Sequence, residues 1–248
     1  MTRPPAIAEL NRLSAGELEA KLSGPPAKRA AFIRQAAEAG VSEAQALYGQ
    51  LLLDGNGLTA APREALQWFV AAAKQGHVLA INMVGRCFDL GWGTPVDKAE
   101  AARWFRIAAE RGLDWGMYNY ATLLTLGEGV AMDRDEALVW FRKAAALGNA
   151  KAMNFVGSFY EDGWVVARDM AMAADWYRQG AEGGDFRARF NHARMLIEKG
   201  EVSEALVWLE RSAATATPRF AGQAREWLGR SGLEEIRAAA RFFEGQAQ

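Results

Sequence analysis

Few residues of this chain have side chains that could act as a nucleophile or a general base at neutral pH. There is one cysteine, Cys87, and there are two histidines, His77 and His192. A thiolate can attack a carbonyl carbon while an imidazole removes or returns a proton, but both groups must be close together and accessible. The surrounding sequence pattern therefore decides whether these three residues are available for chemistry.

Cys87 and His192 stand at positions that other segments of the chain fill with apolar or aromatic residues. For Cys87 these are Leu51, Leu123, Phe159 and Met195, and for His192 they are Val84, Tyr120 and Val156. We therefore expect Cys87 to be a core residue and His192 to be a hydrogen-bonded core histidine. His77 starts a predicted helix where Asn149 and Asp185 stand elsewhere, so it is interpreted as a helix cap.

No other pattern indicates catalysis or cofactor binding. The sequence has no metal-ligand cluster, no nucleophile elbow and no phosphate-binding loop, and "GWG" and "GEG" are interpreted as turns. Acidic pairs such as Glu161-Asp162 and Glu234-Glu235 are too common on helix surfaces to indicate acid-base chemistry without a basic partner or a pocket. The sequence therefore predicts a protein that is not an enzyme, with no cofactor and no metal.

One stretch of thirteen residues recurs through the middle of the chain. "EALQWFVAAAKQG" (64–76) is followed by "EAARWFRIAAERG" (100–112) and "EALVWFRKAAALG" (136–148). The aromatic pairs begin at Trp68, Trp104, Trp140 and Trp176, so the interval is always 36 residues. Such a period is typical of stacked helical pairs, each of which buries its apolar face only against its neighbours.

Each unit predicts two helices. The helix over 64–74 has small and aromatic residues on one stripe, including Trp68 and Phe69, and Gly76 suits the left-handed residue that ends it. The next helix, as in "NAKAMNFVGSFYEDG" (149–163), ends in a glycine-rich turn. Its middle position holds glycine or alanine, which we expect to allow close helix packing; the residues are Gly49, Gly85, Ala121, Gly157 and Ala193. We also expect Trp140→Ala to cost about 3–5 kcal/mol.

These patterns predict an all-α solenoid of stacked antiparallel helix pairs. Residues 1–26, including "AIAELNRL" and "AGELEAKLSG", are interpreted as an N-terminal helical cap, and residues 27–214 as the repeat array. Residues 215–248 are interpreted as a degenerate repeat followed by a capping helix in "LEEIRAAARFFEG".

The pattern A-xxx-[VA]-G-xx-[FY]-xx-G-x-G followed by [DE]-xx-EA-xx-WF-xx-AA-xx-G closely resembles the Sel-one-like repeat (SLR) family, relatives of the tetratricopeptide repeat. The resemblance covers about residues 27–214, and "GEGVAMDRDEALVWFRKAA" (127–145) carries its connecting part. It implies a right-handed superhelix that acts as an adapter for protein or peptide partners, and it implies no chemistry. It also favours a bacterial source.

In this family the helix after each glycine lines a concave groove. Where the resemblance holds, helical spacing puts four equivalent positions of each unit on the groove side. These positions are Leu79, Asn82, Arg86 and Asp89; Trp115, Tyr118, Thr122 and Thr125; Lys151, Asn154, Ser158 and Glu161; and Arg187, Phe190, Arg194 and Ile197. One stripe alternates amide and aromatic side chains: Asn82, Tyr118, Asn154 and Phe190. We expect the amides to pair with a bound backbone and the aromatics to act as anchors.

Two tryptophans form a possible second contact edge. Trp92 and Trp164 occupy equivalent loop positions in "GWG" and "GWV", where other units have Asn56 and Glu128. An exposed indole there could touch a partner. The favoured interpretation is that each folds back over a junction between units, because large apolar side chains seldom remain exposed.

Composition limits the remaining function classes. Basic (29) and acidic (30) residues nearly cancel, which disfavours a nucleic-acid partner. "MTRPPAIAELNRL" lacks the unbroken apolar run of a secretion signal, no stretch is long and apolar enough to span a membrane, and a single cysteine forms no internal disulfide, so we expect a cytoplasmic protein.

The predicted function is a non-enzymatic scaffold that binds a protein or peptide. One alternative is an inhibitory binder, such as an immunity protein that caps a toxin or an enzyme. A cell-wall or β-lactam-related enzyme is a third interpretation, and it would need an export signal and disulfides that the sequence does not contain.

Overall fold

The computed structural model describes residues 13–244, and this part of the chain is all-α. Its helices are α2 (Ala15–Leu22), α3 (Pro26–Glu38), α4 (Ser42–Asp54), α5 (Pro62–Lys74), α6 (Val78–Leu90), α7 (Lys98–Glu110), α8 (Asp114–Leu126), α9 (Arg134–Ala146), α10 (Ala150–Asp162), α11 (Met170–Glu182), α12 (Phe186–Glu198), α13 (Val202–Ala213), α14 (Pro218–Gly229) and α15 (Glu234–Ala238), followed by the 3-10 helix η1 (Ala239–Phe243). None of the helices in residues 13–244 is long and apolar enough to cross a membrane.

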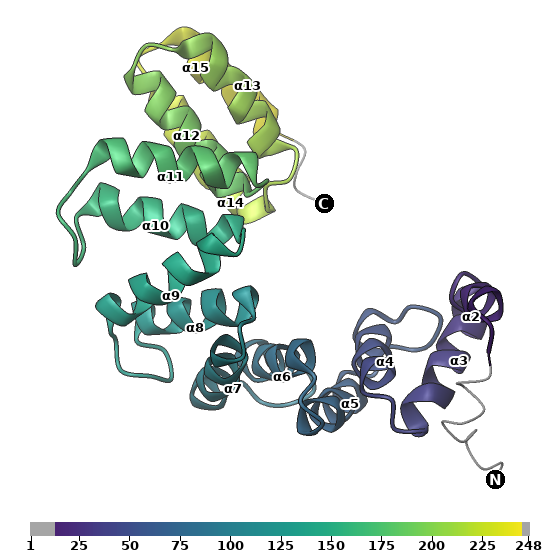
Figure 1. Ribbon diagram of the computed structural model, residues 1–248. Helices are drawn as coiled ribbons and strands as arrows, with labels where there is room; N and C mark the ends of the chain where they lie inside the picture. Colours follow the sequence, from purple (N-terminus) through teal and green to yellow (C-terminus); the bar gives the residue numbers. More distant parts are fainter. Residues whose placement is uncertain (1–12, 245–248) are drawn as a thin grey trace. The chain divides into compact units, whose positions relative to one another are not determined.

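The chain divides into two compact units, one ending at Met132 and one beginning at Asp133. The first contains α2 to α8 and the second α9 to η1, and within each unit consecutive helices of the repeat lie side by side (Figure 1). We call the helices that carry Trp68, Trp104, Trp140, Trp176 and Trp208 B helices (α5, α7, α9, α11 and α13) and the helices that alternate with them A helices (α4, α6, α8, α10 and α12). The predicted stacked helix pairs are confirmed.

The helix ends follow the predicted signals. The A helix α6 ends at Gly91 in the left-handed conformation (φ 75°), and the side chain of Asp97 accepts a hydrogen bond from the backbone N–H of Glu100 at the start of α7. The predicted cap at His77 is confirmed, since its Nδ1 accepts from the N–H of Ala80 at 3.2 Å. Local sequence therefore sets the boundaries of these helices.

In the B helices α5, α7, α9 and α11, the most deeply buried aromatic residue is the second of the pair. Phe69, Phe105, Phe141 and Tyr177 are at most 2% exposed, whereas the tryptophans before them are half-buried. Trp140 lies along its own helix, where its Nε1 donates to Glu136 at 3.0 Å and Lys143 lies over its ring. We therefore expect Phe141→Ala to cost more stability than Trp140→Ala, for which the cost of about 3–5 kcal/mol stays a prediction.

The mid-helix glycines make room for these buried rings. A Cβ added at Gly85 would lie 2.6 Å from the ring of Phe105, and one at Gly157 would lie 2.6 Å from the ring of Tyr177. A real Cβ cannot approach so closely without movement of the ring, so the aromatic residue occupies the space that the missing side chain leaves. The prediction that glycine here allows close packing is confirmed.

The second glycine of each loop brings the loop against the preceding B helix. Gly93 has φ 74°, and a Cβ there would lie 2.3 Å from the backbone oxygen of Pro62. Gly129 is held in the same way against Lys98. In the second unit Val165 takes this position with φ 43°, a left-handed conformation that is strained for a β-branched residue.

The ends of the chain extend the array with shorter elements. At the N-terminal end α2 packs on α3, while most of "AIAELNRL" (6–13) lies outside the described residues. At the C-terminal end "LEEIRAAARFFEG" (233–245) forms α15 and η1, and η1 packs against both α13 and α14; its last residue is outside the described range. The domain boundaries at residues 26 and 214 remain a prediction.

Candidate functional site

Four large apolar side chains are exposed at the two ends of the neighbouring A helices α6 and α8. Leu79 (57% exposed) and Trp115 (43%) lie in the first turns, and Leu90 (49%) and Leu126 (59%) end the helices. An interval of eleven residues is close to three full turns, so both members of a pair point from the same side of their helix. We call these four residues, with Arg86 between Leu79 and Leu90, the α6–α8 face.

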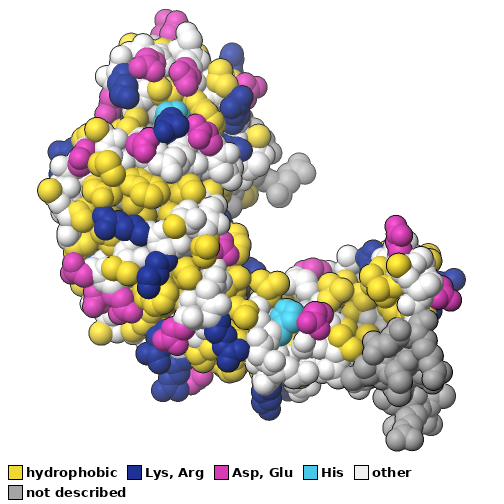
Figure 2. Space-filling model, in the orientation of Figure 1, with side chains coloured by type: hydrophobic (Ala, Val, Ile, Leu, Met, Phe, Trp, Pro, Cys, Tyr) yellow, Lys and Arg dark blue, Asp and Glu magenta, His cyan; other side chains and the backbone are white. Residues whose placement is uncertain are grey.

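The other A helices have charges where this face is apolar. At the first-turn position the chain has Glu43, Lys151 and Arg187, and at the last-turn position it has Asp54, Asp162 and Glu198. A repeat needs no exposed leucine at either position in order to fold, as these three helices demonstrate. The exposed apolar side chains of α6 and α8 are therefore a local feature of two repeats. On the face of the molecule that Figure 2 shows, acidic and basic side chains are interspersed with hydrophobic ones.

Asn82 and Asn154 do not face outward as expected. They are 7% and 6% exposed, and each Oδ1 accepts a hydrogen bond from an asparagine of the next A helix: Asn119 at 3.0 Å and Asn191 at 2.9 Å. A buried amide must be paired, and here the neighbouring repeat supplies the partner. These two residues join successive repeats within one compact unit. We therefore correct their assignment as contacts for a partner's backbone.

In the second unit, the predicted groove residues Ser158, Glu161 and Arg194 form one polar network. The Tyr177 hydroxyl lies 2.6 Å from Glu161 Oε2 and 3.2 Å from Ser158 Oγ, and Arg194 pairs with Glu161 Oε1 while donating to Asn191. Burial, followed by the bond to Glu161, raises the pKa of Tyr177, so the phenol stays protonated and donates. These side chains therefore bind one another.

Phe190 is also covered by the chain itself. It is 6% exposed and makes edge-to-face contacts with Phe220 and Trp227 of α14 and with Phe243 of η1, at 5.4 to 6.1 Å between ring centroids. The expectation of an open aromatic anchor at Phe190 is wrong, because the C-terminal helices pack over this position. The sequence predicted a degenerate repeat in the region of α14 and a cap in the region of α15 and η1, but not their contact with Phe190.

In the first unit, several of the remaining predicted residues also have intramolecular partners. Asp89 pairs with Lys98 at 2.7 Å, and Lys98 also pairs with Glu128 at 3.1 Å. Thr122 donates to the carbonyl of Tyr118 within its own helix, and the Tyr118 ring lies edge-on to Trp115 at 5.9 Å. Five of the predicted groove residues therefore lie on or beside the α6–α8 face: Leu79, Arg86, Trp115, Tyr118 and Thr122.

Leu90 and Leu126 are part of this face but were missed by sequence analysis. They lie 22 residues after Trp68 and Trp104, one residue beyond the positions that were compared between units. Comparing the last turn of each A helix would have found them, because the sequence has aspartate or glutamate there in the other three units.

The loop tryptophans fold back, as the favoured interpretation expected. Trp92 is half-buried against the core of the first unit, with the guanidinium of Arg86 4.7 Å above its ring. Trp164 contacts Phe159 edge-to-face at 5.3 Å and carries Arg134 over its ring at 4.5 Å. Each indole is thus stacked by an arginine of its own unit, and Trp92 supports the side chain of Arg86.

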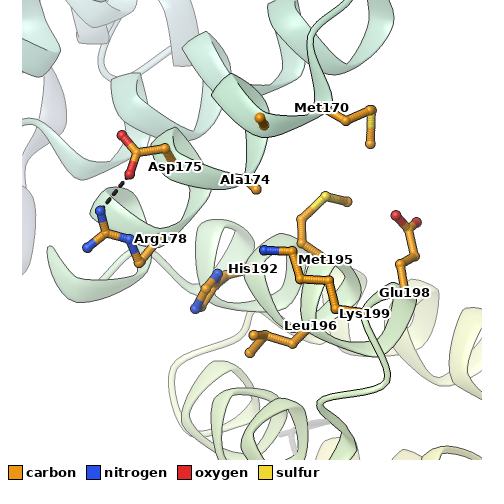
Figure 3. A pocket seen from close by; sticks show the side chains of 10 residues that line it. Met170, Ala174, Asp175, Arg178, His192, Met195, Leu196, Glu198 and Lys199 are labelled. Carbon is orange, nitrogen blue, oxygen red and sulfur yellow. Dashed lines mark hydrogen bonds and ion pairs between the residues drawn. The ribbon is translucent and has the colours of Figure 1, made fainter.

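A cavity of about 480 Å³ lies between α11 and α12 in the second unit (Figure 3). Met170, Ala174, Met195 and Leu196 supply apolar walls, and the rim carries an Asp175–Arg178 ion pair together with Glu198 and Lys199. His192 also lines it, with its ring edge-on to Trp208 at 5.3 Å. Acidic and basic groups are equal in number on this rim, so it has no net charge that would select a ligand.

His192 is buried as expected, but its Nδ1 has no hydrogen-bond partner. Burial lowers the pKa of His192 below its ordinary value of 6.5. The unfolded chain therefore takes up this proton more readily than the folded chain. The stabilising effect of neutral His192 is complete above pH 6.5 and is lost as the pH falls towards the folded-state pKa.

We expect acidification to pH 5 to lower the melting temperature of the wild-type protein more than that of His192→Leu. Thermal unfolding followed by circular dichroism at pH 5 and pH 8 measures the difference. Other titrating groups, including buried Asp185, whose pKa is raised by burial, are common to both proteins. An equal pH effect in both proteins would contradict a buried neutral histidine.

Cys87 is a closed core residue, as predicted. It is fully buried, and burial raises the pKa of its thiol to about 11. At neutral pH it is therefore a thiol and not the nucleophilic thiolate. Among residues 13–244, histidine, cysteine, aspartate and glutamate side chains form no group of three or more that could hold a metal ion.

Three comparisons with known proteins place this architecture. The family model of the Sel1 repeat matches residues 42–77, 78–113, 116–149 and 150–185, together more than half of the chain. No curated protein matches the sequence.

Among solved structures, the Sel1 repeat protein from Oxalobacter formigenes has a TM-score of 0.77 at 24% identity, with 91% of this chain and 95% of that chain covered. The SLR-fold protein c5321, a protective antigen of uropathogenic Escherichia coli strains, has a TM-score of 0.68 at 29% identity over 88% of this chain. This chain spans about half of c5321 (48%). The immunity protein Pa5087 from Pseudomonas aeruginosa has a TM-score of 0.55 at 16% identity, with 82% and 79% covered.

The four matched repeats coincide with the helix pairs from α4 to the start of α12, including both helices of the α6–α8 face. The chain therefore belongs to the Sel1 repeat family.

Proposed function

We propose that this protein is a non-enzymatic scaffold that holds a protein or peptide partner on the α6–α8 face. The observation that carries this proposal is the exposure of Leu79, Leu90 and Leu126 where the other A helices have charged residues. The other A helices form with charged residues at these positions, so the fold does not require leucine there.

A partner would gain free energy by covering these side chains. Burying an exposed leucine fully stabilises a complex by about 1.5–3 kcal/mol, and the four apolar side chains lie at both ends of two neighbouring helices. Trp115 adds an aromatic side chain, a residue type enriched at the energetic centre of interfaces. Such an arrangement suits a segment that lies along the helices and is held at two places.

The accessible chemistry of the chain supports binding over catalysis. Cys87 is protonated and closed off, His77 caps α6, and His192 is buried against Trp208. In the second unit Glu161, Arg194, Tyr177 and Ser158 are bound to one another. None of these groups is placed as an activated nucleophile beside an accessible base.

The test compares a surface variant with a matched control. Leu79→Glu combined with Leu126→Glu places two charges on the α6–α8 face, and Leu147→Glu combined with Leu233→Glu makes the same chemical change at leucines that are 58% and 45% exposed elsewhere. Wild-type protein and both variants are immobilised, exposed to lysate of the source cells and analysed by quantitative mass spectrometry. Circular dichroism verifies that all three have the same helicity.

We expect one or a few proteins to be captured by the wild type and the control and lost, by about tenfold or more, from the face variant. Captured proteins that remain on the face variant would place binding elsewhere on the molecule. Absence of captured proteins from all three samples would remove the proposal's support.

An inhibitory binder remains the second candidate. The immunity protein Pa5087 has the same fold at 16% identity, which supports a shared architecture and not a shared partner. An inhibitor predicts one partner bound in a 1:1 complex together with loss of that partner's activity, whereas an adapter leaves the activity intact. Assaying the captured protein with and without this chain separates the two.

A further inference from the structure

We infer that the partner segment carries a carboxylate side chain between two apolar anchors, and that this carboxylate binds Arg86. The inference rests on the proposed use of the α6–α8 face and adds the chemistry of the ligand. It comes from comparing Arg86 with the arginine at the equivalent position of the second unit, Arg194, which lies three periods further along the chain.

Arg194 shows how an arginine at this position of an A helix is satisfied. It pairs with the carboxylate of Glu161, which comes from the preceding A helix, α10. The side chains of Arg194 and Glu161 are only 23% and 18% exposed, so water screens the pair little. The geometry of this repeat therefore accommodates a carboxylate beside the guanidinium.

Arg86 has no such carboxylate. The residue that corresponds to Glu161 in the first unit is Leu53, a half-buried apolar residue of α4. The nearest acid along its own helix, Asp89, is bound to Lys98 at 2.7 Å. Within residues 13–244, Arg86 forms no ion pair; its contacts are the ring of Trp92 and the sulfur of Met83 at 3.8 Å.

Charge complementarity thus selects the occupant. With Asp89 neutralised by Lys98, the guanidinium of Arg86 is the unpaired charge among the apolar side chains of the α6–α8 face. A carboxylate from a partner would form the charge-assisted hydrogen bonds that Glu161 provides for Arg194. An uncharged segment would instead cover the guanidinium without replacing its water, which is unfavourable.

The apolar residues fix the spacing of the occupant. Leu79 and Leu90 are eleven residues apart on α6, which is about 16 Å along the helix axis. Arg86 lies between them, nearer to Leu90. The inferred ligand is therefore an acidic segment with apolar side chains near both ends of this span and aspartate or glutamate between them.

A displayed library of random 16-residue peptides tests this inference on the full-length chain. Peptides are selected on the wild type, on Arg86→Glu and on the Leu79→Glu, Leu126→Glu double variant. We expect wild-type selections to be enriched in aspartate or glutamate flanked by leucine, isoleucine, phenylalanine or tryptophan. On Arg86→Glu we expect the acidic position to change to lysine or arginine.

Individual affinities give the size of the effect. For a selected acidic peptide, Arg86→Gln is expected to weaken binding by about tenfold or more, as is replacing the peptide's acid by its amide. The control Arg103→Gln removes the same charge from an arginine paired with Glu100 on the B helix α7 and should leave the affinity unchanged. Melting temperatures of all variants verify that each is folded.

The outcomes separate the two proposals. Peptides that need Leu79 and Leu126 but show no acidic preference, or no change of preference on Arg86→Glu, would overturn the carboxylate inference and leave the proposed face intact. Peptides enriched equally on the wild type and on the leucine double variant, or no enriched peptides at all, would overturn both.

Discussion

Replacing Phe141 by alanine is expected to lower the free energy of unfolding of the second unit by about 3–5 kcal/mol. Phe141 is fully buried in α9, stacks on Phe155 at 4.7 Å between ring centroids with planes 7° apart, and meets Phe159 edge-to-face at 6.0 Å. The substitution removes the ring around which α9 packs on α10, and neighbouring backbones cannot collapse into the cavity without disturbing both helices.

Urea denaturation followed by circular dichroism measures this loss. Val139→Ala is the matched control, because Val139 lies two residues away on the same helix and is 49% exposed; its effect should be within about 0.5 kcal/mol. Trp140→Ala should fall between the two. If Trp140→Ala were the more damaging substitution, the assignment of Phe141 as the central residue of the helix pair would be wrong.

This comparison also marks what the sequence could predict. The 36-residue period, the aromatic pairs and the glycine signals were sufficient to predict the helix pairs, because each depends on local periodicity and backbone conformation. The order of burial within a Trp-Phe pair depends on a rotation of the helix by 100°, and both residues lie on the apolar stripe. Only the packed structure shows that the phenylalanine points inward and the tryptophan lies along its own helix.

The candidate site was harder to predict for a related reason. Helical periodicity identifies the side of α6 or α10 from which a residue points, but it does not identify what covers that side. Asn82 and Asn154 lie on the predicted groove side of their helices, yet each is hydrogen-bonded to an asparagine of the next repeat. Phe190 lies on the same side and is covered by α14 and η1. These contacts join residues 30 or more positions apart, so no local pattern contains them.

Arg86 illustrates the opposite case. Its type and position were sufficient to include it among the groove residues, and the structure adds that its intramolecular carboxylate is missing. The comparison of Leu53 with Glu161 is present in the sequence, but it has meaning only once Arg194 is known to reach across to the preceding A helix. The structure shows that an arginine at this position pairs with a carboxylate of the preceding A helix, and the sequence shows that Arg86 has Leu53 in place of that carboxylate.

The loop after α6 supports Arg86 through the ring of Trp92. Gly93→Ala is expected to destabilise the first unit by about 3 kcal/mol or more. Alanine at φ 74° is itself strained by about 1–2 kcal/mol, and its Cβ would lie 2.3 Å from the oxygen and 2.5 Å from the carbonyl carbon of Pro62. These are backbone atoms at the start of α5, so the clash can be relieved only by moving the loop or the helix.

Gly112→Ala is the control that separates strain from clash. Gly112 has φ 87°, and an added Cβ would meet no atom within 4 Å, so this variant should show only the conformational strain of about 1–2 kcal/mol. Equal losses in the two variants, measured by urea denaturation, would contradict a tight loop contact at Gly93. Because Trp92 precedes Gly93 and carries the Arg86 guanidinium on its ring, a displaced loop should also weaken binding of acidic peptides to the α6–α8 face. Gly112→Ala leaves that loop unchanged, so it should retain the affinity.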